Sequence, residues 1–135
     1  MALITTKGLA DFEPDKPLDP TWYGLHIEDA KTQKDGYSVM LKVVLIDGPE
    51  QKDGSDPVGR KMNDFVRFGG FESHKDGGKF AKTIATSLLD AAGLDRESFD
   101  PDELIGKEVN GLVNVGTDQR TGLPREGFIL FASRE

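Results

Sequence analysis

Residues 36–47 (GYSVMLKVVLID) constrain the fold more than any other run of this 135-residue chain. If the run is extended, alternate side chains point to opposite faces. One face is wholly apolar and consists of Tyr37, Val39, Leu41, Val43 and Leu45. The other face begins polar, carries Lys42 at its centre and ends apolar at Val44 and Ile46. The run therefore predicts a strand that is covered on one face throughout and on both faces over its last part.

Four further runs are typical of strands, at residues 21–32, 60–68, 107–115 and 127–133. Asp35-Gly36 is a hairpin signal that joins the first of these runs to residues 36–47. In the first strand the apolar face is Tyr23, Leu25 and Ile27. In the run 60–68, one face carries Lys61, Asn63, Phe65 and Arg67. That face is too polar for a core, so we expect it to point outward.

Residues 76–92 predict the main helix, because Phe80, Ile84 and Leu88 recur at helical spacing. Asp76 is the expected N-cap and Gly93 the expected left-handed stop. A second start signal at Asp100-Pro101 predicts one short helical turn that Gly106 closes.

The resulting order is three strands, one helix and two strands. This order predicts an all-β domain with one main helix, a five-stranded OB-fold barrel with the helix between strands 3 and 4. The rival is an open α+β sheet with the helix across one face, which needs an apolar layer that residues 60–68 do not supply. We expect the domain to span residues 21–135, after an extended, acidic, proline-rich lead-in over residues 1–20.

Composition limits the setting. The chain has no cysteine, no run of about 20 apolar residues and no signal-peptide pattern, which favours a soluble cytoplasmic protein. The net charge of −7 weighs against a nucleic-acid partner. Residues 60–82, however, hold six Lys/Arg against three Asp/Glu. Because salt screens the distant negative charges, this local positive excess can still attract an anion.

Several short motifs fall in an order that resembles one family. They are residues 59–61 (GRK) before the third strand, 92–93 (AG) at the helix end and 103–107 (ELIGK) before the fourth strand. With the strand patterns around them, over about residues 21–133, they resemble the small OB-fold single-stranded DNA-binding proteins of bacteriophages. The resemblance implies sequence-independent binding of single strands in phage replication or recombination, in the host cytoplasm, and contact with replication or recombination proteins.

Single-strand binding needs aromatic faces for bases and cations for phosphates. The outward face of the third strand and its neighbours offers candidates, and the loops between strands 1–2 and 4–5 add cations. The predicted DNA-binding residues are Trp22, Lys34, Lys42, Lys61, Phe65, Arg67, Arg120 and Arg125, with Lys31 beside them. Each has a structural alternative: Phe65 buried under the helix, Trp22 packed on the lead-in, and the loop cations simply solvated.

Catalysis finds little support. His26 and His74 lack metal-ligand spacing to a partner, and the acidic pairs 28–29 and 102–103 do not form an acid/base pair. The glycine pairs 69–70 and 77–78 precede the helix, but no Lys-Ser/Thr follows them in P-loop spacing. We therefore expect no enzyme activity, no catalytic residue, no cofactor and no metal.

The alternative function is a protein-interaction or assembly module on the same fold. Self-association stays open, because the edges of strands 1 and 5 could pair with a neighbouring copy.

Overall fold

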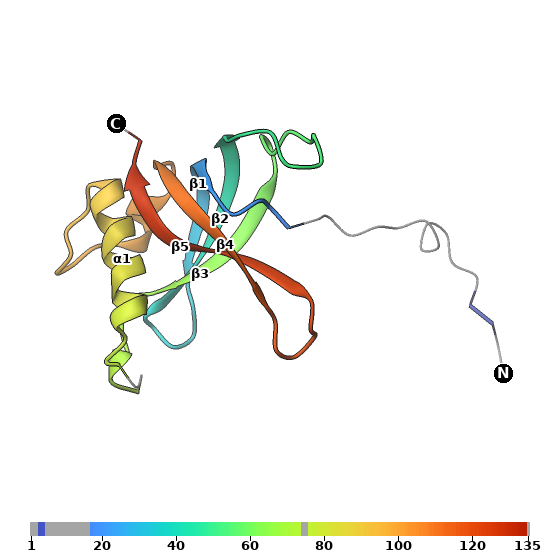
Figure 1. Cartoon of the computed structure of the whole chain (residues 1–135). Coiled ribbons are helices and arrows are strands. Elements are labelled where there is room, and N and C mark those ends of the chain that lie inside the picture. Colours follow the sequence, from blue (N-terminus) through green and yellow to red (C-terminus); the bar gives the residue numbers. More distant parts are fainter. Residues whose placement is uncertain (1–2, 5–16, 74–75, 135) are drawn as a thin grey trace.

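The computed structural model describes residues 3–4, 17–73 and 76–134. This part forms one five-stranded antiparallel sheet and one α-helix (Figure 1). The strands are β1 (Trp22–Thr32), β2 (Ser38–Asp47), β3 (Lys61–Arg67), β4 (Glu108–Thr117) and β5 (Pro124–Ser133); the helix is α1 (Lys79–Ala92). Two 3-10 turns, η1 (Phe71–Ser73) and η2 (Pro101–Leu104), flank the helix in sequence. The prediction of a mostly-β domain with one helix between the third and fourth strands is confirmed.

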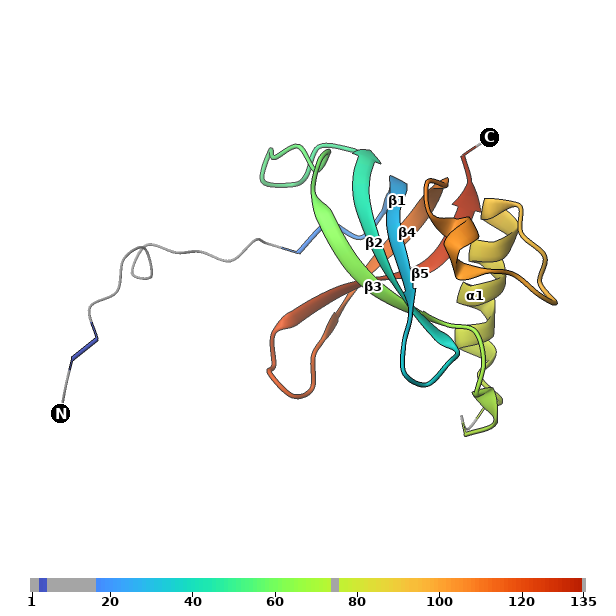
Figure 2. The same ribbon diagram turned by 180° about the vertical axis from the view of Figure 1, so that it is seen from behind.

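The strands lie in the order β3-β2-β1-β4-β5, so β3 and β5 are the two ends of the sheet. The sheet is strongly curved, with α1 at one side and residues 17–20 entering from the other (Figures 1 and 2). No backbone ladder joins β3 to β5 in the described part of the chain. The predicted closed barrel is therefore not confirmed, and the sheet stays open between these two strands.

The inward face of β2 matches the sequence prediction. Its four central side chains Val39, Leu41, Val43 and Leu45 are buried, together with Tyr23, Leu25 and Ile27 of β1. A bulge between Ile27 and Asp29 shifts the alternation of β1, so that Ala30 also points inward. Burial of these apolar side chains supplies the main driving force for the fold.

One glycine on the inward face of β4 is required by packing. A Cβ atom at Gly111 would lie 2.7 Å from Leu25 Cδ1 and 2.8 Å from Phe128 Cδ1. Such contacts are too short for carbon atoms, so the absent side chain leaves the space that the Phe128 ring occupies.

The helix prediction needs two corrections. Helix α1 starts at Lys79 after Gly78, which has a left-handed φ of 76°. Asp76 does not cap this helix and instead accepts a hydrogen bond from the Gly78 N–H, before the first helical turn. Phe80 was expected in the core stripe, but it is 62% exposed because the buried face is formed by later residues. Gly93 ends the helix in the left-handed conformation, as predicted.

The predicted lead-in lies mostly outside the described residues, but its last part, residues 17–20, packs on the sheet. Leu18 is buried in the core, and its N–H donates to Glu126 Oε2 at 2.7 Å. The Tyr23 hydroxyl donates to the carbonyl of Asp19 at 2.7 Å. This short segment therefore belongs to the folded domain beside the start of β5.

Candidate nucleic-acid interface

The outward face of β2 and β3 brings an aromatic ring, a thioether and an ammonium group into one cross-strand row. Met40 of β2 pairs with Phe65 of β3 on one side and with Lys31 of β1 on the other. Phe65 is 52% exposed, so it is not buried under the helix. Side chains directly opposite each other in a sheet lie close enough to act together.

The next rows add two cations, each with an acid nearby. Lys42 pairs with Asn63 on β3 and with Asp29 on β1. Lys61 pairs with Val44, and its Nζ lies 3.9 Å from Glu28 Oε2. Both lysines are exposed, so these acids weaken the local positive potential without removing the cations from solvent.

Arg67 lies at the end of β3, but its guanidinium is engaged within the protein. It donates to the carbonyls of Gly69 and Gly70, both at 2.9 Å, and to the Tyr37 hydroxyl at 3.1 Å. It also stacks over the Tyr37 ring at 4.7 Å. These contacts fix the turn after β3, which is a structural task that the sequence did not indicate.

Trp22 lies away from this face. It pairs with Leu112 of β4, which in turn pairs with Leu130 of β5. Trp22 is nine residues before Lys31 along β1, which corresponds to about 30 Å in an extended strand. The structure therefore separates Trp22 from Phe65 and places it in an apolar outward row.

The loop cations lie in two projections of the sheet. Lys34 is in the β1–β2 loop, and Arg120 and Arg125 belong to the β4–β5 hairpin; all three are exposed. Both projections extend toward the same side of the domain (Figures 1 and 2). None of the three makes an ion pair with another described residue.

Strands β3 and β5 share no backbone ladder, but side chains connect them. We call this region, residues 60–65 and 126–128, the β3–β5 junction. Asp64 Oδ2 accepts the N–H of Phe128 at 2.9 Å, and Arg60 forms an ion pair with Glu126. Burial raises the pKa of the Asp64 carboxyl, and the two N–H groups that it binds oppose this shift.

Sequence reasoning missed Met40, Asn63 and Asp64. Met40 and Asn63 were visible as the outward positions next to Lys42 and Phe65, once the β2–β3 register is known. Asp64 carried the stronger signal, since it is an acid on the inward face of a strand between Met62 and Val66.

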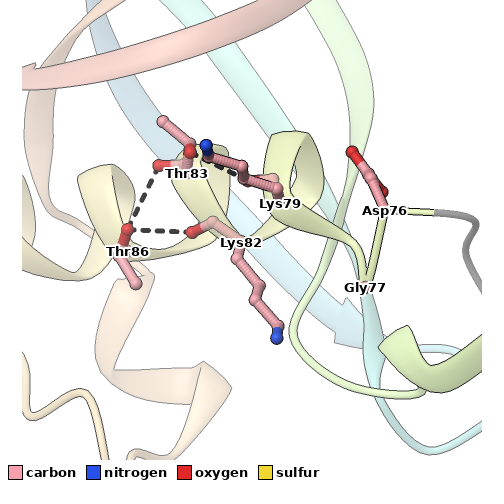
Figure 3. A pocket seen from close by; sticks show the side chains of 6 residues that line it. All are labelled: Asp76, Gly77, Lys79, Lys82, Thr83 and Thr86. Carbon is pink, nitrogen blue, oxygen red and sulfur yellow. Dashed lines mark hydrogen bonds between the residues drawn. The ribbon is translucent and has the colours of Figure 1, made fainter.

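Helix α1 carries a shallow polar hollow of about 390 Å³ near its start. Its lining side chains are shown in Figure 3. The Thr83 and Thr86 hydroxyls donate to backbone carbonyls of their own helix, at 2.8 Å to Lys79 and Lys82 respectively. The ammonium groups of Lys79 and Lys82 extend in different directions, so the hollow does not converge on one ligand (Figure 3).

Comparison with known proteins adds no identity, because no protein-family model matches the chain and no curated protein matches it. The described residues hold no group of three or more His, Cys, Asp or Glu side chains arranged to bind a metal ion. His74 lies outside the described residues, and His26 Nδ1 is 3.5 Å from a Glu108 carboxylate oxygen.

None of the described helices has the length and hydropathy needed to cross a bilayer. Function is therefore inferred from the fold, the outward face of β2 and β3, and the sequence motifs.

Proposed function

We propose that this chain is an OB-type single-stranded DNA-binding protein of the bacteriophage kind. It binds single strands without sequence preference, catalysis, cofactor or metal, and supports phage DNA replication or recombination in the host cytoplasm. Replication or recombination proteins are its expected protein partners.

The strand order supports an OB-type architecture. OB-folds are five-stranded, partly open Greek-key barrels, and they bind oligonucleotides on the face of strands 2 and 3. Here β3 and β5 end the sheet, and side chains connect them at two successive points. Arg60 meets Glu126 and Asp64 meets Phe128, so the two strands run side by side in the same direction.

The observation that carries the proposal is the outward row formed by Phe65, Met40 and Lys31, in which Phe65 and Lys31 are exposed and Met40 is half-buried. An exposed phenyl ring offers a surface on which any base can stack, because every base has a π-face. Met40 extends that surface with a polarisable thioether. Lys31, with Lys42 in the neighbouring row, supplies ammonium groups for the phosphates that connect stacked bases.

Flanking loops complete the proposed site. Lys34 in the β1–β2 loop and Arg120 and Arg125 in the β4–β5 hairpin contact the backbone of the bound strand. Paired bases in a duplex do not expose their faces to a flat protein surface, so this arrangement favours single strands. Phosphate contacts make the affinity fall as salt rises.

The direct test is titration of fluorescein-labelled oligo-dT with the full chain at low salt. Wild-type protein should bind at micromolar concentration or below. Replacing Phe65 by Ala should weaken binding by about 1–3 kcal/mol, the usual value of one base–aromatic stack. Absence of binding by the folded wild-type protein at micromolar concentration would exclude the proposed function.

Phe80 offers a matched control for the aromatic deletion. It is 62% exposed, slightly more than Phe65, but it lies on α1 and outside the proposed face. Phe80→Ala should leave the oligo-dT affinity unchanged. If both Phe→Ala variants weaken binding equally, the bases do not stack specifically on the face of β2 and β3.

A second candidate function is a protein-interaction or assembly module, which the outward row of Trp22, Leu112 and Leu130 favours. These side chains are apolar, adjacent across three strands and at least partly exposed. Interaction surfaces are commonly enriched in such aromatic and aliphatic groups. Under this alternative, Trp22→Ala disrupts self-association in analytical ultracentrifugation, and oligo-dT does not bind.

A further inference from the structure

Asp64 is an acid in a position where its neighbours are apolar. Met62 and Val66, two residues before and after it on β3, are buried in the core. Its direct cross-strand partner, Leu41, is completely buried. Asp64 is half-buried, so its carboxylate loses part of its hydration and gains from hydrogen bonds to neighbouring N–H groups.

The two oxygens of Asp64 bind one N–H group from each unpaired end of the sheet. Oδ1 accepts the N–H of Phe65 on β3 at 2.9 Å, and Oδ2 accepts the N–H of Phe128 on β5 at 2.9 Å. These are main-chain donors for which the β3–β5 junction provides no ladder. One carboxylate therefore stands where backbone hydrogen bonds would close a barrel.

Both donors lie close to groups that the proposed function uses. Phe65 carries the proposed stacking ring, and Phe128 is three residues after Arg125 on β5. Gly127 faces the carboxylate, and a Cβ atom there would lie 3.7 Å from both Asp64 oxygens. Two side-chain links therefore connect β3 with the β4–β5 hairpin, the Arg60–Glu126 ion pair and Asp64, and Asp64 is the one that binds main-chain N–H groups on both strands.

We propose that Asp64 is a positioning residue for DNA binding. It holds Phe65 and Arg125 at the distance that lets one bound DNA strand contact both side chains. The inference rests on the proposed function of this face. Asp64 itself does not touch DNA. It acts by ordering the two sides of the site before binding, so that less ordering is required when DNA arrives.

The sign of one mutational effect separates this role from simple electrostatics. Removing a negative charge from an acidic protein should by itself strengthen DNA binding. Loss of the bridge should instead weaken it. Asp64→Ala should therefore bind oligo-dT about tenfold more weakly than wild type, the size of one lost contact of about 1.4 kcal/mol.

Asp95→Ala is the matched control. Asp95 Oδ1 also accepts a backbone N–H close in sequence, that of Glu97, at 2.8 Å, but it lies after α1 and outside the proposed face. This variant loses the same charge and the same kind of local hydrogen bond. It should bind oligo-dT at least as tightly as wild type.

A double-mutant cycle with Arg125→Ala adds a readout that a purely structural role would not change. Arg125→Ala should weaken binding in the wild-type background by several-fold and lower the salt slope. In the Asp64→Ala background the same change should have little effect, because Arg125 is already misplaced.

Circular dichroism melts confirm that each variant is folded before titration. If Asp64→Ala does not fold, Asp64→Asn, which keeps one acceptor oxygen, should still bind more weakly than wild type.

The outcomes separate the two claims. Weakened binding by the folded Asp64 variant, with coupling to Arg125, supports the positioning role. If wild type binds but the folded Asp64 variant binds as tightly as Asp95→Ala, only the positioning role is wrong. If wild type does not bind oligo-dT, the proposed function fails, and the positioning role fails with it.

Discussion

The two faces of β2 differ in how completely packing explains them. The inward face presents Val39, Leu41, Val43 and Leu45, each at most 2% exposed. The outward face presents Met40, Lys42, Val44 and Ile46, of which Lys42 is exposed and the others half-buried. Core packing dictates the first set almost uniquely, whereas the second set is free to carry chemistry. Substitutions on the inward face should thus change stability, and those on the outward face should change binding.

The largest effect is expected from Leu41→Ala on the inward face. Leu41 is fully buried, so truncation leaves a cavity and should lower the free energy of unfolding by about 2–5 kcal/mol. Urea denaturation measures this change, with Lys42→Ala as the outward neighbour that should cost less than about 0.5 kcal/mol. The folded fraction of Leu41→Ala should bind oligo-dT normally. A binding defect without a stability defect would contradict the contrast between the faces.

Arg67 tests whether position alone decides the role of a residue. It occupies an outward position of β3, but its guanidinium is bonded to Tyr37, Gly69 and Gly70. Arg67→Ala should therefore lower the free energy of unfolding by about 1–2 kcal/mol in urea titrations. Arg120→Ala, in the exposed hairpin, is the control and should be neutral for stability. If Arg67→Ala leaves stability unchanged and weakens binding as much as Phe65→Ala does, Arg67 contributes to DNA binding rather than to the turn.

Lys42→Ala should have a smaller effect that appears mainly in the salt dependence of binding. If Lys42 neutralises one phosphate, its loss should reduce the slope of log affinity against log salt by about 0.7, the value for single strands. Oligo-dT titrations at several salt concentrations give the slope. Lys52, an exposed lysine of the β2–β3 loop, provides a control whose replacement should leave the slope unchanged.

The smallest expected effect is a change in the pH dependence of stability at Asp64. Burial raises the pKa of this carboxyl above its ordinary value of 3.8 in the folded protein. The folded state then binds the proton more tightly than the unfolded state, so the contribution of Asp64 is greatest at low pH. It declines as pH rises from near 3.8 through the raised folded pKa.

Comparison of wild type with Asp64→Asn isolates this contribution, since other carboxyls such as Asp35 and Asp90 have lowered pKa values and act in the opposite sense. The stability of wild type relative to the variant should decrease as pH rises through this range. Parallel pH profiles of unfolding free energy for the two proteins would contradict the expectation.

The sequence predicted those parts of the fold that depend on local pattern. Alternation located the core face of β2, and Gly93 marked the end of α1. The start of α1 was misplaced because the left-handed glycine Gly78, rather than Asp76, precedes its first turn. Whether the sheet closes between β3 and β5 could not be predicted, because the contacts there are made by side chains that meet only after the sheet curves.

The candidate site was predictable only as a set of residue types. Period-two alternation correctly placed Phe65 and Lys42 on the outward side of their strands. It could not show that the register of β1 places Trp22 beside β4 and far from them, or that Arg67 turns back onto Tyr37. Such features depend on three-dimensional register, for which a single sequence carries little signal.

The close approach of Gly111 to Phe128 has an evolutionary consequence. A larger residue at position 111 is compatible with the fold only if the side chains at positions 25 and 128 both move or become smaller, since a Cβ atom there would lie 2.7 Å from Leu25 Cδ1 and 2.8 Å from Phe128 Cδ1. Positions 111, 25 and 128 should therefore change together as sequences with this fold diverge. A chain that carries alanine at 111 should be destabilised and should recover only in part when leucine replaces Phe128, because the contact with Leu25 remains.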